Sequence, residues 1–377
     1  MSERVYLARC NTYRAEDLEP LVDKIFRSLH VYDELKPGMT VVLKPNLVMR
    51  GKPEDAAITH PAFAAAVGSC VKKAGAEVLL AESPGGPYTP GIMKSHFKAC
   101  GYADMAEAMG FSLYTGCESR PVTLPEGVVC RRLEIVAPFL EADYLINLAK
   151  LKTHSMVGFS GAVKNLFGVV PGLQKPELHC RFPQKEEFSQ MLTDLCAFLR
   201  PDLSLLDGIW AMEGDGPTGG SRRELGAVIA AKNPYAADLC ATSLIGIEAD
   251  SVLMLRYGKE RGLSPASLSE VELLGDDPAS LRRADFKKAR ASSTDFIDRL
   301  PRFLRPAAKK LTTPYPRIDK KNCVGCGKCA ESCPQHTITV KNRKAEIDYK
   351  NCIHCFCCHE MCPQHVIDVR RFGAFRL

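Results

Sequence analysis

The sequence predicts an α/β fold: a large N-terminal domain with a mostly parallel sheet, followed by a small C-terminal α+β domain. Two observations support this prediction. Residues 1–270 alternate short apolar runs with amphipathic helical patterns, as chains of βαβ units do. The region from 317 onward instead holds nine of the 17 cysteines, in a spaced repeat. We therefore expect domains at 1–280 and 317–377, joined by a basic linker at 281–316.

The expected elements of the large domain follow each other in a regular order. Each helix candidate places apolar residues three and four positions apart, and each strand candidate is a short apolar run. The second helix has Pro61 in its first turn, where proline is tolerated. Helices are expected at 15–29, 60–73, 92–109, 188–199 and 236–246. Strands are expected at 40–43, 77–81, 143–148, 203–206, 227–230 and 271–274.

Polar side chains gather where four of these strands end. They are Lys44 and Asn46, Glu82, Lys152 and His154, and Asp207. Open parallel sheets bind ligands beyond the carboxyl ends of their strands, so these residues are expected to share one site. The alternative is that they are ordinary solvated loop residues.

A further segment, Ser160–Gly168, combines small residues with Lys164 and Asn165 at an expected helix start. Free backbone N–H groups at such a position bind phosphate or carboxylate. The segment lacks the spacing of a P-loop, and Ala162 stands where a nucleophile elbow needs glycine. It therefore indicates an anion site of another kind.

These observations assign two sets of candidate residues. Anion binding is expected from Lys44, Asn46, Lys152, Lys164 and Asn165. Proton transfer or other catalysis is expected from His154, Glu82 and Asp207. An unperturbed imidazole titrates near neutrality and can act as acid or base, although a loop histidine can also be a simple hydrogen-bonding group.

Two cysteine runs, 323–334 and 352–363, share the spacing C-x2-C-x2-C-x3-C-P, the second following the first by 29 residues. Flanking residues repeat as well, which predicts two β-hairpin-plus-turn halves related by a pseudo-two-fold axis. The pattern resembles the bacterial two-cluster ferredoxin module over roughly residues 317–369. In that module the last cysteine of each run ligates the other run's cluster.

The resemblance implies two [4Fe–4S] clusters with crossed ligands. The first set is Cys323, Cys326, Cys329 and Cys362, and the second is Cys333, Cys352, Cys355 and Cys358. Zinc sites also use C-x2-C pairs, but the graded four-cysteine runs followed by proline favour iron–sulfur clusters. Cys357 falls outside the spacing, and we expect a packed free thiol near a cluster, with ligand exchange as the alternative.

Composition limits the class of protein further. The net charge is +6, and residues 282–310 are strongly basic, but they carry no nucleic-acid motif. A solvated linker is expected there, with docking of an acidic redox partner as an alternative. No signal peptide or apolar run of bilayer length is found, and unpaired cysteines suit a reducing compartment. A soluble, cytoplasmic protein without nucleic-acid partners is expected.

The large domain also resembles a known family. Several segments are similar to blocks of the DUF362 family: Val42–Leu47, Thr59–Pro61, Ala142–Asp143, Lys150–His154, Gly161–Gly168 and Asp207–Gly208 with Gly214–Pro217. The similarity covers roughly residues 40–275. That family is uncharacterised and often joined to iron–sulfur modules, so the resemblance implies a redox-linked protein without specifying a reaction.

Three functions are compatible with these features. The first is an iron–sulfur oxidoreductase whose ferredoxin module exchanges electrons between a soluble redox partner and a small anionic substrate or cofactor in the α/β domain. The second is a non-enzymatic electron carrier whose α/β domain docks a partner enzyme. The third is a transferase or ligase whose clusters are structural or sense oxygen.

Overall fold

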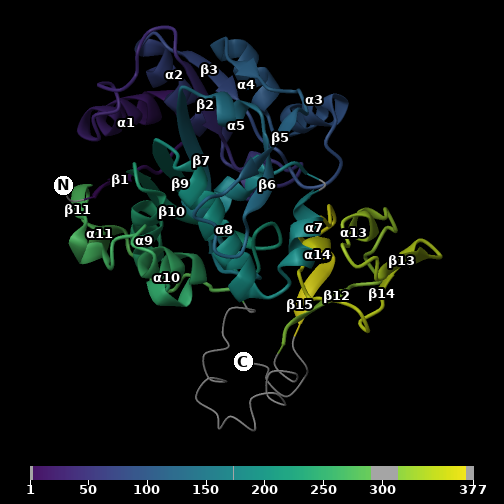
Figure 1. The fold of residues 1–377 in the computed structure, drawn as a ribbon. Helices are drawn as coiled ribbons and strands as arrows, with labels where there is room; N and C mark the ends of the chain where they lie inside the picture. The colour runs from purple at the N-terminus through teal and green to yellow at the C-terminus, as the bar shows by residue number, and fades with distance from the viewer. Residues whose placement is uncertain (1–2, 173, 290–312, 371–377) are drawn as a thin grey trace.

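Figure 1 shows the chain as a computed structural model that describes residues 3–172, 174–289 and 313–370. Residues up to 289 form a large α/β domain, and residues from 313 form a small strand-rich region beside it (yellow in Figure 1). The predicted fold class is confirmed. Most of the expected basic linker, 290–312, lies outside the described residues, so the docking of a partner there stays a prediction.

The large domain is built on one mixed sheet. Its strands are β1 Arg4–Arg9, β2 Thr40–Lys44, β3 Glu77–Leu80, β4 Ser112–Leu113, β7 Tyr144–His154, β8 Gly158–Ser160, β9 Leu203–Glu213, β10 Ser221–Ala231 and β11 Glu272–Gly275. The order is β11-β1-β10-β9-β7-β2-β3-β4, with β8 paired to β7. β9, β7, β2, β3 and β4 run parallel to one another, and β10 is antiparallel to both neighbours. A separate hairpin pairs β5 Ser119–Thr123 with β6 Arg132–Val136.

Helices cover both faces of the sheet. They are α1 Ala15–Ser28, α2 Pro61–Lys73, α3 Pro90–Ala99, α4 Tyr102–Met109, α5 Pro138–Glu141, α6 Ala162–Asn165, α7 Gln174–Arg181, α8 Lys185–Leu199, α9 Pro234–Leu244, α10 Leu253–Glu260 and α11 Pro278–Leu281. Short 3-10 turns lie at η1 Pro53–Asp55, η2 Leu166–Val169, η3 Ala249–Ser251 and η4 Leu268–Glu270.

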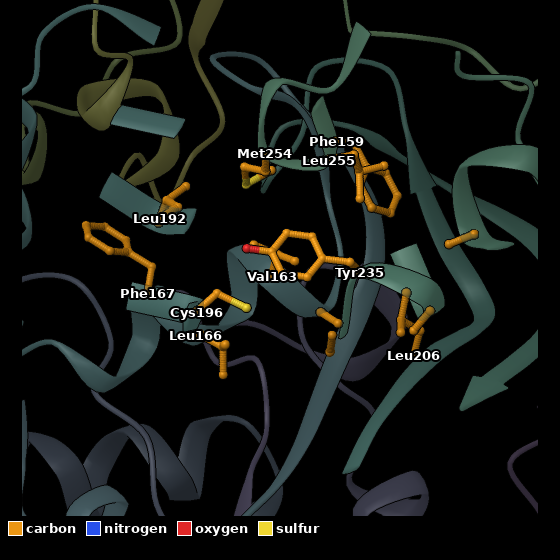
Figure 2. Close-up of a cluster of buried hydrophobic side chains, with 14 of the residues drawn as sticks. Phe159, Val163, Leu166, Phe167, Leu192, Cys196, Leu206, Tyr235, Met254 and Leu255 are labelled. Atoms are coloured by element: carbon orange, nitrogen blue, oxygen red, sulfur yellow. The ribbon is translucent and has the colours of Figure 1, made fainter. Parts of the chain in front are cut away.

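The period-two alternation of the strands divides the interior into two apolar cores. In β1, Tyr6 faces the core formed with α1–α4, and Val5 and Leu7 face the core formed with α6 and α8–α10. Figure 2 shows the second core, where Tyr235 of α9 and Leu192 of α8 lie near Val163 of α6. Fully burying one such side chain contributes roughly 1.5–3 kcal/mol. Packing in the two cores keeps in place the strands whose carboxyl ends carry the polar residues.

The predicted elements are present, with differences in bounds and with further elements that were not predicted, among them α7, α10 and the β5–β6 hairpin. The single helix expected at 92–109 is two helices, because the chain turns at Gly101, whose φ is +76°. β7 and β9 run on to His154 and Glu213, well beyond their expected ends. β1 was not predicted, although it lies inside the sheet between β10 and β11.

The small region repeats itself. β12 Tyr315–Ile318, α13 Lys328–Glu331 and β13 Ile338–Lys341 are followed 29 residues later by β14 Lys344–Ile347, α14 Cys357–Glu360 and β15 Ile367–Arg370. β12 pairs with β15, and β13 pairs with β14. The expectation of a hairpin within each half is therefore wrong. A cysteine run separates the two strands of each half, so each strand finds its partner in the other half. No helix among the described residues is long and apolar enough to cross a membrane.

Candidate functional site

A cavity of about 90 Å³ lies where the carboxyl ends of β2, β3 and β7 approach the C-terminal region. Six of the predicted residues line it: Asn46, Glu82, Lys152, His154, Lys164 and Asn165. The C-terminal region completes the wall with Ser332, Cys357, Glu360 and Met361. We call this space the anion cavity, after the lysine side chains that line it. It is shared by both parts of the chain.

Sheet topology explains the gathering of these side chains. β2, β3 and β7 are adjacent and parallel, so their carboxyl ends meet at one edge of the sheet. Asn46 and Glu82 follow β2 and β3 by two residues each, and Lys152 lies near the end of β7. α6 then returns over this edge and brings Lys164 and Asn165. This arrangement fits the prediction that the residues at these strand ends share one site.

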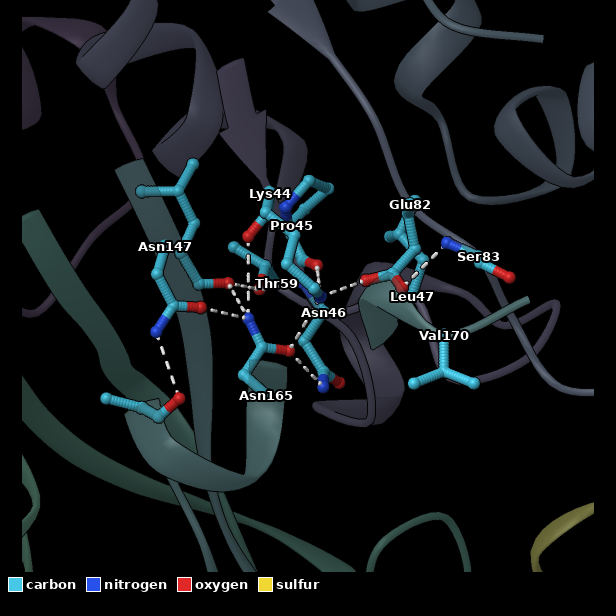
Figure 3. Close-up of polar contacts among 12 residues, drawn as sticks. Lys44, Pro45, Asn46, Leu47, Thr59, Glu82, Ser83, Asn147, Asn165 and Val170 are labelled. Atoms are coloured by element: carbon cyan, nitrogen blue, oxygen red, sulfur yellow. Dashed lines mark hydrogen bonds and ion pairs between the residues drawn. The ribbon is translucent and has the colours of Figure 1, made fainter. Parts of the chain in front are cut away.

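Asn165 stands at the centre of a hydrogen-bonded amide network (Figure 3). Its Oδ1 accepts from Asn46 Nδ2 at 2.7 Å, and its Nδ2 donates to Asn147 Oδ1 at 2.8 Å. Asn147 in turn donates to the carbonyl of Ala162 at 2.9 Å. The network fixes the orientation of Asn46, which leaves its Oδ1 facing the ammonium of Lys152.

Lys44 and Glu82 form a buried ion pair beside this network, with Nζ 2.7 Å from Oε2 and side chains only 0% and 3% exposed. The other oxygen of Glu82 accepts from the Ser83 amide at 2.9 Å. A Cβ on Gly168 would lie 2.1 Å from Glu82 Oε1 and 2.4 Å from Lys44 Nζ, so only glycine fits there. Both Glu82 oxygens are occupied, which favours a structural role over proton transfer. Lys44 lies behind the cavity wall.

Lys152 is buried without a carboxylate at ion-pair distance among the described residues. Its Nζ donates to Asn46 Oδ1 at 2.8 Å and to the carbonyl of Ala57 at 2.7 Å. Burial lowers the pKa of Lys152 to about 7, and the nearby charge of Lys164 acts in the same direction. A bound anion would supply the missing negative charge.

Lys175 of α7 was not predicted, yet it enters the same cavity. Its Nζ donates to the backbone carbonyls of Ser83, at 2.6 Å, and Val170. Burial lowers the pKa of Lys175 to about 7, an effect that the Glu82 carboxylate opposes. Like Lys152, it is held by neutral oxygens rather than by its own carboxylate.

Lys164 reaches the cavity from α6 with its ammonium over two rings, 4.9 Å from the centroid of Phe167 and 5.7 Å from that of Phe188. Cation–π contacts hold the ammonium without neutralising it. Burial lowers the pKa of Lys164, and the Glu360 carboxylate opposes this shift. With Lys152 and Lys175, this makes three cations around one enclosed space.

Two buried polar atoms in the cavity wall have no hydrogen-bond partner within the described chain. They are Nδ1 of His179 and Oε1 of Glu360. His179 is 4% exposed, and its ring stacks on Phe188 at 4.3 Å. Buried polar atoms in native proteins are normally satisfied by protein, water or ligand. His179 Nδ1 is therefore left for a ligand or water, whereas Glu360 Oε1 has His154 Nε2 at 3.4 Å as its nearest polar neighbour.

His154 is a hydrogen-bond donor toward the cavity. Its Nδ1 accepts from the backbone amides of Met156 and Val157 at 3.1 and 3.4 Å, which places the proton of the neutral ring on Nε2. Nε2 lies 3.4 Å from Glu360 Oε1. Burial, reinforced by Lys164 and Lys152, lowers the pKa of His154 well below its usual value. This arrangement suits a neutral hydrogen-bond donor more than the acid or base expected from the sequence.

Asp207 lies apart from the anion cavity, and its predicted place there is wrong. β9 continues six residues beyond it, so Asp207 is inside the strand rather than at its end. It accepts from Lys150 Nζ at 2.8 Å, from Tyr13 Oη at 2.7 Å and from the His60 amide at 3.0 Å. Tyr13 also stacks on the His60 ring at 3.8 Å. The carboxylate is fully occupied in a structural network.

The cysteines of the C-terminal region surround two smaller cavities. The outer thiol cavity is lined by Cys323, Cys326, Cys329 and Cys362. The inner thiol cavity is lined by Cys333, Cys352, Cys355 and Cys358. Each cavity takes three cysteines from one run and the last cysteine of the other. Within the described ranges, no three His, Cys, Asp or Glu side chains converge as ligands of a single ion would.

Backbone amides point at cysteine sulfurs in both thiol cavities. The amide of Thr337 donates to Cys333 Sγ at 3.3 Å, and the amide of Ala345 donates to Cys323 Sγ at 3.5 Å. Hydrogen bonds to sulfur stabilise thiolates and tune the potential of a bound cluster. Four thiols, an enclosed space and N–H donors together fit an iron–sulfur cluster in each cavity.

The inner thiol cavity adjoins the anion cavity. Ser332 and Cys357 line the anion cavity, and each precedes a cysteine of the inner set, Cys333 or Cys358. The thiol of Cys357 is also hydrogen-bonded to that of Cys355. Cys357 is therefore the packed thiol that the sequence predicted, and it forms the partition between the two spaces.

Sequence reasoning missed several cavity residues, because they come from outside the strand ends. Lys175 and His179 lie on α7, which no apolar periodicity revealed, and Glu360 lies between two cysteine ligand candidates. The only signal for Glu360 was an acidic residue inside a cysteine repeat. For α7, the spacing of Lys175 and His179, one helical turn apart, was the available clue.

Family models match two parts of the chain. Residues 41–243 match the domain of unknown function DUF362, and residues 315–363 match the 4Fe-4S dicluster domain. The second match supports an iron–sulfur electron-transfer role. A relative, the thylakoid-associated protein sll1697 of Synechocystis, is 32% identical over 269 residues, which cover 71% of this chain and 82% of that protein.

Two solved structures show a distant likeness. One is the lactate racemase apoprotein of Thermoanaerobacterium thermosaccharolyticum, with a TM-score of 0.39 and 17% identity over 61% of this chain. The other is a Thermotoga maritima protein, with a TM-score of 0.37 and 13% identity over 60% of this chain. The chain spans only 54% and 57% of these two proteins.

Proposed function

We propose, from the premise that this chain belongs to the DUF362 family and ends in a 4Fe-4S dicluster domain, that it is an iron–sulfur oxidoreductase acting on a small anion. One observation carries the proposal: the helix α14 and the Ser332–Cys333 segment contribute neighbouring residues to both the anion cavity and the inner thiol cavity. A molecule bound among three lysines would therefore lie beside a redox centre.

We assign one [4Fe–4S] cluster to the outer thiol cavity and one to the inner thiol cavity. The grouping of cysteines around the two cavities and the N–H donors supports this crossed assignment. When bound, such clusters accept and release electrons one at a time. The domain limits expected from the sequence, 1–280 and 317–377 with 281–316 as linker, shift at both ends, because Leu281 and Phe286 pack in the core of the large domain and β12 begins at Tyr315.

The ligand of the anion cavity is proposed to carry a carboxylate or phosphate group. Lys152, Lys164 and Lys175 bring three cations against Glu82, which Lys44 already neutralises, and Glu360, so the space favours negative charge. Asn46 and Asn165 hold Lys152 in place through the amide network. His154 would donate its Nε2–H to a ligand oxygen, in the way an oxyanion hole does.

The alternative of a carrier whose α/β domain only docks a partner enzyme is less well supported. The anion cavity is closed on one side by the protein's own C-terminal region, through contacts such as Thr218 Oγ1 to the Glu360 carbonyl at 3.0 Å. A docking platform would not need buried cations and unsatisfied polar atoms inside an enclosed space. A small ligand accounts for both.

Oxygen-free purification followed by metal analysis and calorimetry tests the proposal. We expect about eight irons and eight sulfides per chain, as two [4Fe–4S] clusters require. A panel of small carboxylates and phosphates should contain members that bind the wild type and bind Lys152→Met and Lys164→Met at least tenfold more weakly. Lys94→Met on the exposed surface of α3 serves as the matched control.

Two results would overturn the proposal. Zinc in place of iron would remove the redox function. Binding of the panel that is equal in the wild type and both cavity variants would remove the anion site, and the protein would then be an electron carrier.

A further inference from the structure

The two thiol cavities have different surroundings. The inner one packs toward the large domain, where Gln335 Nε2 lies 3.4 Å from Cys180 Sγ of α7. The outer one lies at the β13–β14 hairpin, which is at the far side of the C-terminal region from the large domain (Figure 1). Cys326 is exposed, and Val324 is 51% exposed beside it. The outer cavity thus has the most exposed of the eight ligand candidates, whereas Cys352 of the inner set is only partly exposed.

The β13–β14 turn packs closely on the loop of the outer cysteines. Lys344 Nζ donates to the carbonyl of Cys323 at 2.6 Å. A Cβ on Gly325 would lie 2.4 Å from the Arg343 carbonyl, so turn and loop are in backbone contact. The basic side chains of the turn are therefore held around the exposed cysteine.

Positive charge surrounds the exposed edge. The basic residues of the loop and turn are Lys320, Lys321, Lys328, Lys341, Arg343 and Lys344, and the acidic ones are Asp319, Glu331 and Glu346. Glu331 pairs with Lys328 and Glu346 pairs with Lys320. No ion pair is seen for Lys321, Lys341 or Arg343 within the described chain. We call this surface, with Val324 and Cys326 at its centre, the outer face.

We propose that the outer face is the docking surface for an acidic, one-electron carrier protein. An apolar centre ringed by charge of one sign is the arrangement that steers and orients a partner of opposite charge. The partner's reduced cofactor would lose one electron and the outer cluster would gain it, with no atom or proton transferred. This step rests on the proposed clusters but not on the anion cavity. Electrons would then pass from the partner to the outer cluster, from there to the inner cluster, and finally to the ligand.

Stopped-flow reduction of the full-length, cluster-loaded protein tests the docking surface. Reduced flavodoxin serves as the probe, because it is small, acidic and able to donate one electron. The test variant is Lys321→Glu/Lys341→Glu, both exposed, and the matched control is Lys24→Glu/Lys36→Glu near α1, which makes the same change in net charge. Equilibrium binding of flavodoxin by calorimetry gives a second readout that needs no electron transfer.

At low ionic strength we expect the second-order rate constant of the test variant to fall at least tenfold, since steering charges change association rates by 10–10³-fold. The control variant should change less than twofold. Above about 0.5 M salt the wild type and the test variant should converge, because screening then acts within a few ångströms. The affinity should fall in parallel with the rate.

The proposal is overturned if the test variant is reduced as fast as the wild type, or if the control variant slows equally, which would indicate a net-charge effect only. The EPR spectrum of the dithionite-reduced protein separates this outcome from failure of the clusters. A normal spectrum with an unchanged rate refutes the docking surface alone. An absent spectrum refutes the cluster assignment.

Discussion

Two buried lysines on the same strand, Lys150 and Lys152 of β7, show how this molecule separates structure from binding. Both are about 1% exposed and lie two residues apart. Lys150 forms an ion pair with Asp207 at 2.8 Å and also donates to Tyr13 Oη at 3.1 Å. Lys152 meets only an amide oxygen and a backbone carbonyl. One cation is neutralised by the protein, and the other is held for a ligand.

This difference shows which buried charges to regard as functional. A buried ion requires compensation, and in a structural pair the compensation comes from the chain itself. Around the anion cavity, Lys44 follows the structural pattern through Glu82, whereas Lys152, Lys164 and Lys175 do not. The unmatched set lies on the side of the sheet that faces the inner thiol cavity, which is where a substrate would meet a redox centre.

The largest expected effect comes from exchanging each lysine for methionine. Lys150→Met leaves Asp207 buried without its cation and should lower the free energy of unfolding by about 3–5 kcal/mol. Lys152→Met removes a cation that has no carboxylate partner, so the cost of burying that charge disappears with it, and the variant should lose far less free energy of unfolding than Lys150→Met. Denaturant unfolding of both variants measures this difference. Equal losses would contradict the distinction between the two lysines.

The lysines without a carboxylate partner, Lys152, Lys164 and Lys175, should matter more for ligand affinity than for stability. Lys164→Met should weaken binding of an anion from the panel about 10-fold or more, since hydrogen bonds to charged groups contribute roughly 1.5–3 kcal/mol. Its stability should stay near that of the wild type. Calorimetric titration measures the affinity, with Lys94→Met as control, and unchanged affinity would place the anion elsewhere.

Ligand affinity should also depend on pH in a defined direction. Lys152 and Lys175 have pKa values of about 7, so each loses its charge as pH rises through neutrality. Anion affinity should therefore fall between about pH 6 and pH 8, and binding near and above pH 7 should take up protons. Titrations in buffers of different ionisation enthalpy measure both. Affinity that rises over this range would contradict the assignment.

Stability without ligand should depend on pH in the opposite direction. The folded-state pKa of these two lysines lies below their unfolded value of about 10.4, so the unfolded chain binds more protons between the two values. The free energy of unfolding should therefore rise as pH increases from about 7 toward 10, by an amount that Lys152→Met reduces. Urea unfolding at several pH values measures this slope.

The smallest effect is expected at His154, whose predicted role changes from acid or base to hydrogen-bond donor. His154→Gln can keep an N–H donor near the cavity and should lower anion affinity only about twofold. His154→Phe removes the donor and should lower it about tenfold, in line with one hydrogen bond of roughly 1–1.5 kcal/mol. A pH–rate profile that loses a limb in both variants would instead support proton transfer by His154.

The sequence was sufficient for the fold and for most of the anion cavity, for a physical reason. Parallel strands bring their carboxyl ends together, so Asn46, Glu82 and Lys152 converge whatever lies between them. The same argument failed for Asp207, because β9 continues past it and strand length is not encoded by a short apolar run. Local patterns locate strands better than they locate strand ends.

Other parts of the site depend on how two regions of the chain dock, which local patterns do not specify. Glu360 and Cys357 enter the cavity only because α14 packs against the large domain, where His359 Nε2 lies 3.0 Å from the Asp215 carbonyl. Gly219 leaves room for that ring, since a Cβ there would lie 2.5 Å from it. Such contacts appear in the sequence as isolated polar or small residues.

An EPR-monitored redox titration of Lys164→Met at pH 6 tests the central claim most directly, namely that the cationic cavity adjoins the inner cluster. Loss of a positive charge makes an added electron less stable, so the inner cluster's potential should become more negative by on the order of tens of millivolts. The potential of the outer cluster should change much less. Lys341→Met should instead change the potential of the outer cluster more than that of the inner cluster. Equal shifts at both clusters, or none at either, would contradict the account.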